Sequence, residues 1–194
     1  MIGEVLIFLR DHLNAYLNAK SVLTPGGDSG EDKVVFVDGE KMDPITFKLG
    51  AVSTLLINVE EDNTLRTADP FTVVSADGTH RKAKPEIRMN LYVLFVAHFK
   101  DYKESLRYLS RIIAHFQSNR ALTRENAPNL PGELEKLVMI LVTLPFNEQN
   151  EIWNALRTTY YPSVLYKVGV VVFKDRETAL PPGLVEEISI ETNG

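Results

Sequence analysis

Cysteine is absent from this sequence, and tryptophan occurs once in 194 residues. Without thiols the protein has no disulfide, no thiolate zinc site, no iron–sulfur cluster and no cysteine nucleophile. The absence does not indicate a compartment, because a chain without cysteine suits a reducing cytosol and an oxidising exterior equally well.

Long apolar runs are missing too. No stretch approaches the ~18 uninterrupted apolar residues that a membrane-spanning helix needs. The apolar start of the chain has no basic leader and no small-residue cleavage site, and Glu4, Arg10 and Asp11 interrupt it. We therefore expect a soluble protein that is made in the cytoplasm and does not insert into a membrane.

Positive charge is scarce relative to negative charge. The sequence has 21 Lys and Arg against 26 Asp and Glu, which gives a net charge of −5. A weakly acidic chain has no general attraction to phosphate backbones, so nucleic acid is not expected as a partner. The hydrophobic fraction of 44% is ordinary for a globular protein, and the length suits a single domain.

Motifs for catalysis and cofactor binding are also missing. The glycines match neither a phosphate-binding loop nor a dinucleotide fingerprint, and no Gly-x-Ser-x-Gly elbow occurs. The histidines show no metal-ligand spacing, and we interpret them as isolated surface or core residues: His12, His80, His98 and His115. We predict no catalytic residue, no cofactor and no metal.

The sequence does contain alternating helical and strand patterns. Apolar residues at helical spacing predict helices over 1–20 and 102–119, and a short helix that begins after Asn147 as its cap. Strand patterns occupy 34–37, 51–60, 71–75, 86–99, 133–144, 164–173 and, more weakly, 184–191. Loops are expected at 21–33 and 120–131. The order predicts an α+β fold, with a mixed β-sheet packed by about three helices.

The segment 86–99 is the strongest strand prediction. Nearly every residue from 91 to 97 is apolar, which is typical of a central strand covered on both faces. Asp101 is predicted to cap the helix that follows. Gly169, inside the last strongly apolar strand, suggests a bulge or a close approach of neighbouring backbone.

The tightest carboxylate cluster is Glu60, Glu61 and Asp62. A calcium site normally needs 6–8 oxygen ligands, and nothing nearby in the sequence supplies them. Two interpretations remain open, namely a charged strand end that leads into a loop and an electrostatic contact with a neighbouring subunit.

The one basic cluster, Arg81, Lys82 and Lys84, follows a turn signal at Asp77-Gly78. A small basic turn of this kind can dock phosphate or an acidic protein surface. No aromatic residues interleave with it to stack on nucleotide bases.

An aromatic group lies near the predicted short helix: Trp153, Tyr160, Tyr161 and Tyr166. Core packing around that helix explains the group without a ligand. The alternative is an interface anchor, because Trp and Tyr are favoured at interface centres.

Three stretches together resemble one known family. They are NVEEDNTLR at 58–66, NLYVLFVAHF at 90–99 followed by IIAHFQ at 112–117, and NEQNEIWNALR at 147–157 running into YYPSVLYKV at 160–168. Their order and spacing resemble the cap, or tail-terminator, proteins of extracellular contractile injection systems, phage-tail-like particles of the virulence-cassette and antifeeding types. The resemblance covers about residues 1–175.

The resemblance implies a structural protein and not an enzyme, built as one tail-terminator-like domain over 1–194. Six copies would form a ring on the distal end of the tube and sheath, end polymerisation and anchor the sheath to the tube. The implied partners are further copies of the chain and the sheath and tube subunits. The particle would be cytoplasmic during assembly and then released. Some family members carry an additional C-terminal domain, whose function is not carried over to this chain.

Closed rings use heterologous contacts that repeat head to tail. We expect the tail at 175–194 to add a strand to the sheet edge of a neighbouring subunit. Candidate interface residues, chosen for exposure and chemistry, are Glu60, Glu61, Asp62, Arg66, Arg81, Lys82, Lys84, Tyr160, Tyr161, Val185, Ile188 and Ile190.

Two other functions compete with the cap. The first is a baseplate or tube-associated adaptor of the same machine. The second is a metal- or nucleotide-dependent enzyme that uses Glu60, Glu61 and a histidine. The enzyme is disfavoured because no nucleophile, base and orienting group occur together.

Overall fold

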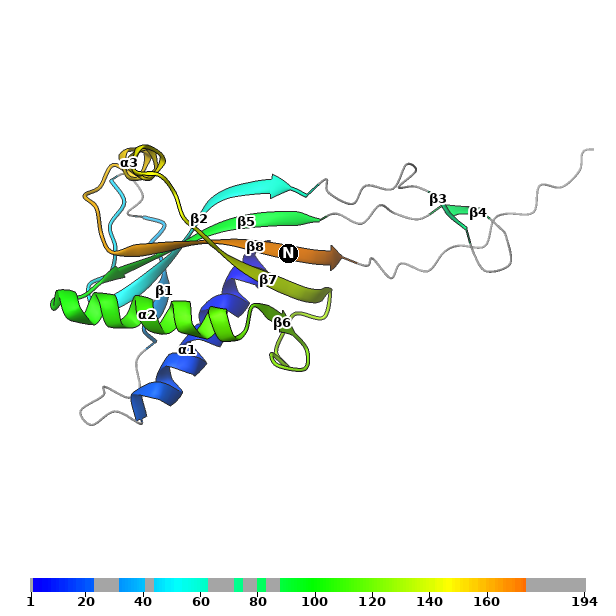
Figure 1. Ribbon diagram of the computed structural model, residues 1–194, viewed down its shortest axis with the longest axis horizontal. Helices are drawn as coiled ribbons and strands as arrows, with labels where there is room; N and C mark the ends of the chain where they lie inside the picture. The colour runs from blue at the N-terminus through cyan, green and yellow to red at the C-terminus, as the bar shows by residue number, and fades with distance from the viewer. Residues whose placement is uncertain are drawn as a thin grey trace, which may run out of the picture.

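A computed structural model describes residues 2–22, 32–40, 44–62, 72–74, 80–82 and 88–173 (Figure 1). Its helices are α1 (Ile2–Val22), α2 (Tyr102–Ser118) and α3 (Phe146–Ala155). Its strands are β1 (Val34–Phe36), β2 (Ala51–Glu61), β3 (Thr72–Val74), β4 (His80–Lys82), β5 (Met89–His98), β6 (Ala121–Thr123), β7 (Leu134–Val142) and β8 (Ser163–Phe173).

Six of these strands form one sheet in the order β1-β2-β5-β8-β7-β6. β1 runs parallel to β2, and every other neighbouring pair in this sheet is antiparallel. β3 and β4 form a separate antiparallel pair. The predicted α+β fold with a mixed sheet and three helices is therefore confirmed for the described residues.

The helices lie on both faces of the large sheet. Figure 1 shows α1 and α2 on one face and α3 on the other. The larger core cluster joins Leu9 and Leu13 of α1 and Ile112 of α2 to the sheet, and the smaller one joins Trp153 of α3 to Phe47. Within the described part of the chain, no helix is both long and apolar enough to cross a membrane.

β5 is the central strand that its apolar run predicted. It pairs with β2 along one side and with β8 along the other. Its residues alternate between the two core clusters, with Val93 and Phe95 facing α1 and α2, and Leu94 and Val96 facing α3. Burial on both faces explains why this strand shows no polar alternation.

α2 begins where the sequence predicted. The side chain of Asp101 accepts a hydrogen bond of 3.0 Å from the Lys103 backbone N–H, which satisfies one free donor of the first turn. Apolar residues at three- and four-residue steps, among them Leu109, Ile112 and Phe116, then form the buried stripe.

Three local predictions were wrong. α3 begins at Phe146 after Pro145, so Asn147 lies inside the first turn and no side chain caps the helix. The expected loop at 120–131 contains β6, which pairs with β7. The first two positions of the expected loop at 21–33 belong to α1, which runs to Val22, and positions 23–31 lie outside the described residues. A short edge strand is formed by backbone pairing with its neighbour, which residue preferences do not encode.

Gly169 does not form the expected bulge. Its pairing is regular on both sides, with Asn90 in β5 and Val138 in β7. A Cβ atom there would lie 3.6 Å from Asn90 Oδ1, which is ordinary contact and not a close approach. The register shift lies instead in β2, between Leu56 and Asn58.

Candidate interaction surfaces

The acidic end of β2 belongs to a polar network across three strands. The Tyr92 hydroxyl donates a hydrogen bond of 2.9 Å to Glu60 Oε2, and Lys167 Nζ donates one of 3.2 Å to the same oxygen. Lys167 Nζ also lies 5.7 Å from the centroid of the Tyr92 ring. We call these three residues the Glu60 network.

Each member of the Glu60 network stabilises the charge of another. The Tyr92 hydroxyl and then Lys167 lower the pKa of Glu60, because both donate to its carboxylate. Burial acts to lower the pKa of Lys167, but its contacts with Glu60 and Tyr92 outweigh burial and raise it. At neutral pH, Glu60 and Lys167 are therefore an ion pair with the neutral Tyr92 beside them, on an exposed part of the sheet.

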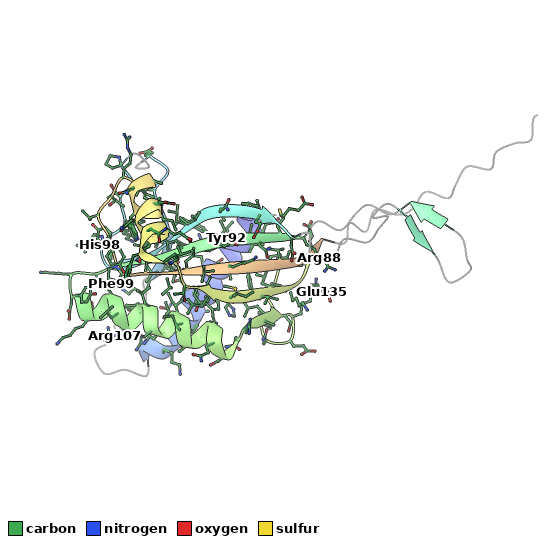
Figure 2. All side chains as sticks on the ribbon, turned by 45° about the horizontal axis from the view of Figure 1, so that its top comes forward. Arg88, Tyr92, His98, Phe99, Arg107 and Glu135 are labelled. Atoms are coloured by element: carbon green, nitrogen blue, oxygen red, sulfur yellow. The ribbon has the colours of Figure 1, made fainter. Side chains whose placement is uncertain are left out.

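The network lies on the sheet face that carries α3. Tyr92 packs against the core cluster that contains Trp153. Figure 2 shows Tyr92 midway along β5, with Arg88 at one end of that strand and His98 at the other. The Glu60 side chain is about half exposed, so this face presents charge to solvent.

Glu61 and Asp62 continue the acidic strand end. Glu61 pairs with Met89 in register, and the Asp62 N–H donates to the Arg88 carbonyl at 2.8 Å. Among the described residues, no three histidine or carboxylate groups come together as a metal site. The acidic cluster is thus an exposed strand end, and its role in a subunit contact stays a prediction.

Several predicted site residues lie outside the described residues: Arg66, Lys84, Val185, Ile188 and Ile190. Arg81 and Lys82 lie in β4, where they pair with Val73 and Thr72. The basic segment therefore contains a short strand that the sequence did not predict, and not only a turn.

The aromatic group divides into two parts. Tyr161 packs with Phe47, His98 and Trp153, with ring centroids 5.6, 4.7 and 6.3 Å apart. Tyr166 belongs to the other core cluster, where it contacts Phe95 and Phe116. Its burial raises the pKa of Tyr166 to about 12.

Two aromatic side chains near α3 are exposed to solvent. Tyr160 is 59% exposed although its ring lies 5.4 Å from that of Trp153. Phe146, the first residue of α3, is 86% exposed. Of the two predicted tyrosines, Tyr160 is thus accessible to a partner, whereas Tyr161 is mainly a packing residue.

The interpretation of isolated histidines was wrong for two of them. The Nε2 atoms of His12 on α1 and His115 on α2 lie 2.9 Å apart, a hydrogen-bond distance. The centroid of the Tyr16 ring lies 4.2 Å from that of the His115 ring, and the centroid of the Phe8 ring lies 5.4 Å from that of the His12 ring. The two histidines are 103 positions apart, so no sequence spacing could have paired them.

A hollow of about 350 Å³ adjoins His12. It lies between α1 and the segment after β6. Its lining consists of Glu4, Ile7, Phe8, Asp11, His12, Ala15, Asn129 and Pro131 and contains no Lys or Arg. Its carboxylates and apolar side chains offer no anion site.

One edge of the sheet is closed by a helix. The side chain of Asn14 on α1 donates to the Val34 carbonyl at 2.9 Å and accepts from the Val34 N–H at 2.8 Å. The amide thus satisfies the outward-facing backbone groups of Val34, at the start of β1, as a neighbouring strand would. Arg10 adds cover, with its guanidinium carbon 5.0 Å from the Phe36 ring centroid.

The other edge is only partly covered. β6 pairs with residues 136–138 of β7, and the Arg120 carbonyl accepts from the Met139 N–H at 2.8 Å. On the side of β7 that faces away from β8, no described strand lies beside residues 140–142. Ile140 is 37% exposed and Leu141 is 47% exposed.

Sequence reasoning found Glu60 but missed its partners. Tyr92 and Lys167 are 32 and 107 positions away from it. One signal was available, because Lys167 is the only charged residue of an otherwise apolar strand at 163–173. A lone charge in such a strand indicates a carboxylate partner.

Comparisons with known proteins agree with this fold. The family described as the Pvc16 N-terminal domain matches residues 4–187. No curated protein matches the chain.

Two solved structures resemble the chain. The first is the "PVC sheath/tube terminator in extended state" of an extracellular contractile injection system, with a TM-score of 0.56 and 19% identity over 100% of this chain and 64% of that one. The second is the anti-feeding prophage cap, "AFP tube terminating cap", with a TM-score of 0.46 and 20% identity over 73% of this chain and 49% of that one. The chain therefore spans less than two thirds of either structure, and its likeness to the first is one of fold.

Proposed function

Because the chain belongs to the family of the Pvc16 N-terminal domain, we propose that it is a structural cap, or tail terminator, of a contractile injection system. In this role it sits on the distal end of the tube and sheath, ends their polymerisation and anchors the sheath to the tube.

The observation that carries this proposal is the extent of the family match. It covers residues 4–187, so it includes every described strand and all of the three helices except the first two residues of α1. The similarity of fold between the whole of this chain and part of a sheath/tube terminator supports it further. The partners we propose are therefore the sheath and tube subunits of the particle.

We propose that the cap is a ring of identical copies, most simply a hexamer. A ring needs two different surfaces on each copy, because heterologous contacts repeat head to tail until they close. The described residues offer distinct candidates, namely the Glu60 network, the exposed aromatic residues Phe146 and Tyr160, and the partly covered edge of β7.

A structural role rather than catalysis also suits the polar groups that the fold brings together. The Glu60 carboxylate accepts from Tyr92 and Lys167, and the two histidines bond to each other. These contacts join separate strands or separate helices to one another, which is how polar groups stabilise a fold. The protein would be made in the cytoplasm and leave the cell as part of the released particle.

The test is to place a tag before Met1, purify particles from producing cells, and locate the tag by electron microscopy against untagged particles. Labelling at the end opposite the baseplate is expected. Labelling at the baseplate would replace the cap with an adaptor of the same machine. Particles without label would end both proposals.

A further inference from the structure

The two edges of the large sheet differ in their capacity to accept another strand. At β1, the Asn14 side chain already occupies the outward N–H and C=O of Val34. At β7, pairing with β6 ends at Val138, and the Arg120 carbonyl takes the next outward donor, at Met139. The edge beyond Met139 is where an additional strand fits.

The backbone of Leu141 faces outward along this edge. In an antiparallel ladder the N–H and C=O of one residue point to the same side, and the side alternates from residue to residue. Since the Met139 N–H points toward the β6 side, the Leu141 N–H and C=O do so as well. The backbone groups of Ile140 face β8, where Ile140 pairs with Lys167.

The side chains beside this edge are apolar and basic. Ile140 and Leu141 are 37% and 47% exposed, whereas the other large apolar side chains of β7, Leu134, Leu137 and Met139, are buried. No Asp or Glu occurs between positions 136 and 147, whereas Arg120 lies opposite Met139. Glu135 lies toward the other end of β7 (Figure 2).

The end of the sequence has the complementary chemistry. Residues 177–194 contain four glutamates and no Lys or Arg. Within them LVEEISI, at 184–190, carries β-branched residues at Val185, Ile188 and Ile190. Pro181 and Pro182 precede it and favour an extended approach.

We propose that the free part of the β7 edge, residues 140–142, binds residues 184–190 of a second copy of this chain as an added strand. The Leu141 backbone supplies the hydrogen bonds, and the exposed Arg120 beside the edge favours the acidic segment. This inference rests on the proposed function, because a ring of copies places one chain's tail against the next chain's sheet.

A cysteine-free chain allows a direct test, since any introduced thiol is the only one present. Full-length Ile140→Cys and Ile188→Cys chains carrying different tags are mixed at high concentration, and are also co-expressed in producing cells. Mild oxidation should give a disulfide-linked dimer that carries both tags. Leu106→Cys on the exposed face of α2 serves as the control acceptor, with at least a tenfold lower yield expected.

A second variant tests the hydrogen bond itself. Leu141→Pro removes an outward N–H and leaves the pairing with β8, whereas Leu141→Val keeps the donor. Combined with Ile140→Cys, the proline should reduce the cross-linked yield at least tenfold, and the valine should not. Circular dichroism and thermal unfolding establish that each variant is folded.

A third chain carries both Ile140→Cys and Ile188→Cys. Three results would overturn the inference: no cross-link in either setting, an equal yield with Leu106→Cys, or a cross-link that forms only within the doubly substituted chain. The last would assign the segment to its own sheet. These results are independent of where the tag lies on the particle, so a cap without this contact remains distinguishable from a protein that is not a cap.

Discussion

His12 and His115 make the packing of α1 against α2 depend on protonation. Their Nε2 atoms lie 2.9 Å apart, so one ring must donate and the other must accept. When both rings carry two protons, neither nitrogen can accept and the charges repel. Burial lowers the pKa of His12, and burial followed by the neighbouring His12 lowers the pKa of His115 to about 4.

The free energy of unfolding should therefore fall as pH decreases from about 6.5 to about 4. In this window the unfolded chain binds protons that the folded chain does not, so the neutral pair stabilises the fold above the window and loses that contribution within it. Urea unfolding of the wild type and of His115→Gln at several pH values would measure this. Parallel pH profiles for the two proteins would contradict the prediction.

Asn14 links α1 to the edge strand β1 through its side chain. Its amide is buried and makes both hydrogen bonds to the Val34 backbone. Asn14→Ala should lower the free energy of unfolding by about 2–3 kcal/mol, because two buried backbone groups lose their partners. Urea denaturation measures this, and Asn147→Ala on the exposed side of α3 is the matched control, with a change of less than about 0.5 kcal/mol expected.

At this scale the sequence indicated the kind of residue but not its partner. Glu60 was predicted as a charged strand end, and it is one. Its contacts with Tyr92 and Lys167 required the pairing of β2, β5 and β8, which brings distant positions together. The histidine pair likewise depends on two helices that pack on the same sheet face, and no local pattern carries that information.

The helices and strands with the strongest sequence patterns were the ones predicted most accurately. Long periodic segments, such as α1, α2, β5 and β8, were predicted within a few residues of their observed bounds. α2 also carried a capping residue, Asp101, which was identified correctly. The short β6 and the uncapped start of α3 were missed, because tertiary contacts rather than residue preferences determine them.

Asp101→Ala should lower the free energy of unfolding by about 1 kcal/mol. The change removes the side-chain acceptor of the Lys103 N–H at the start of α2. Asp101→Asn keeps an acceptor and should be close to neutral. Thermal or urea unfolding of both variants distinguishes loss of the cap from loss of the charge, and equal destabilisation would favour the charge.

For the whole molecule, the strand patterns and the central apolar run predicted a mixed sheet with helices. Local patterns could not predict the strand order, the parallel pairing of β1 with β2, or the division of the core into two clusters. Family membership followed from the joint order of several stretches. Their chemistry alone would have left only an α+β protein without an evident site.

A substitution in the Glu60 network should affect assembly of the particle without affecting folding of the protein. Glu60→Lys should leave the thermal midpoint nearly unchanged, because the carboxylate is exposed, yet should reduce incorporation of the protein into particles. Incorporation is measured by quantitative immunoblot of purified particles, with Glu125→Lys as an exposed control. Normal incorporation of Glu60→Lys would remove this face from the candidate interfaces.

The closure of β1 by Asn14 has a consequence for hydrogen exchange. Outer-strand amides usually exchange with water quickly, whereas Val34 is fully buried and its N–H is bonded to a helix side chain. Its exchange requires α1 to lift from the sheet. The deuteration rate of this one amide therefore reports how often the first helix detaches, and in Asn14→Ala it should rise well before the amides of β5 become labelled.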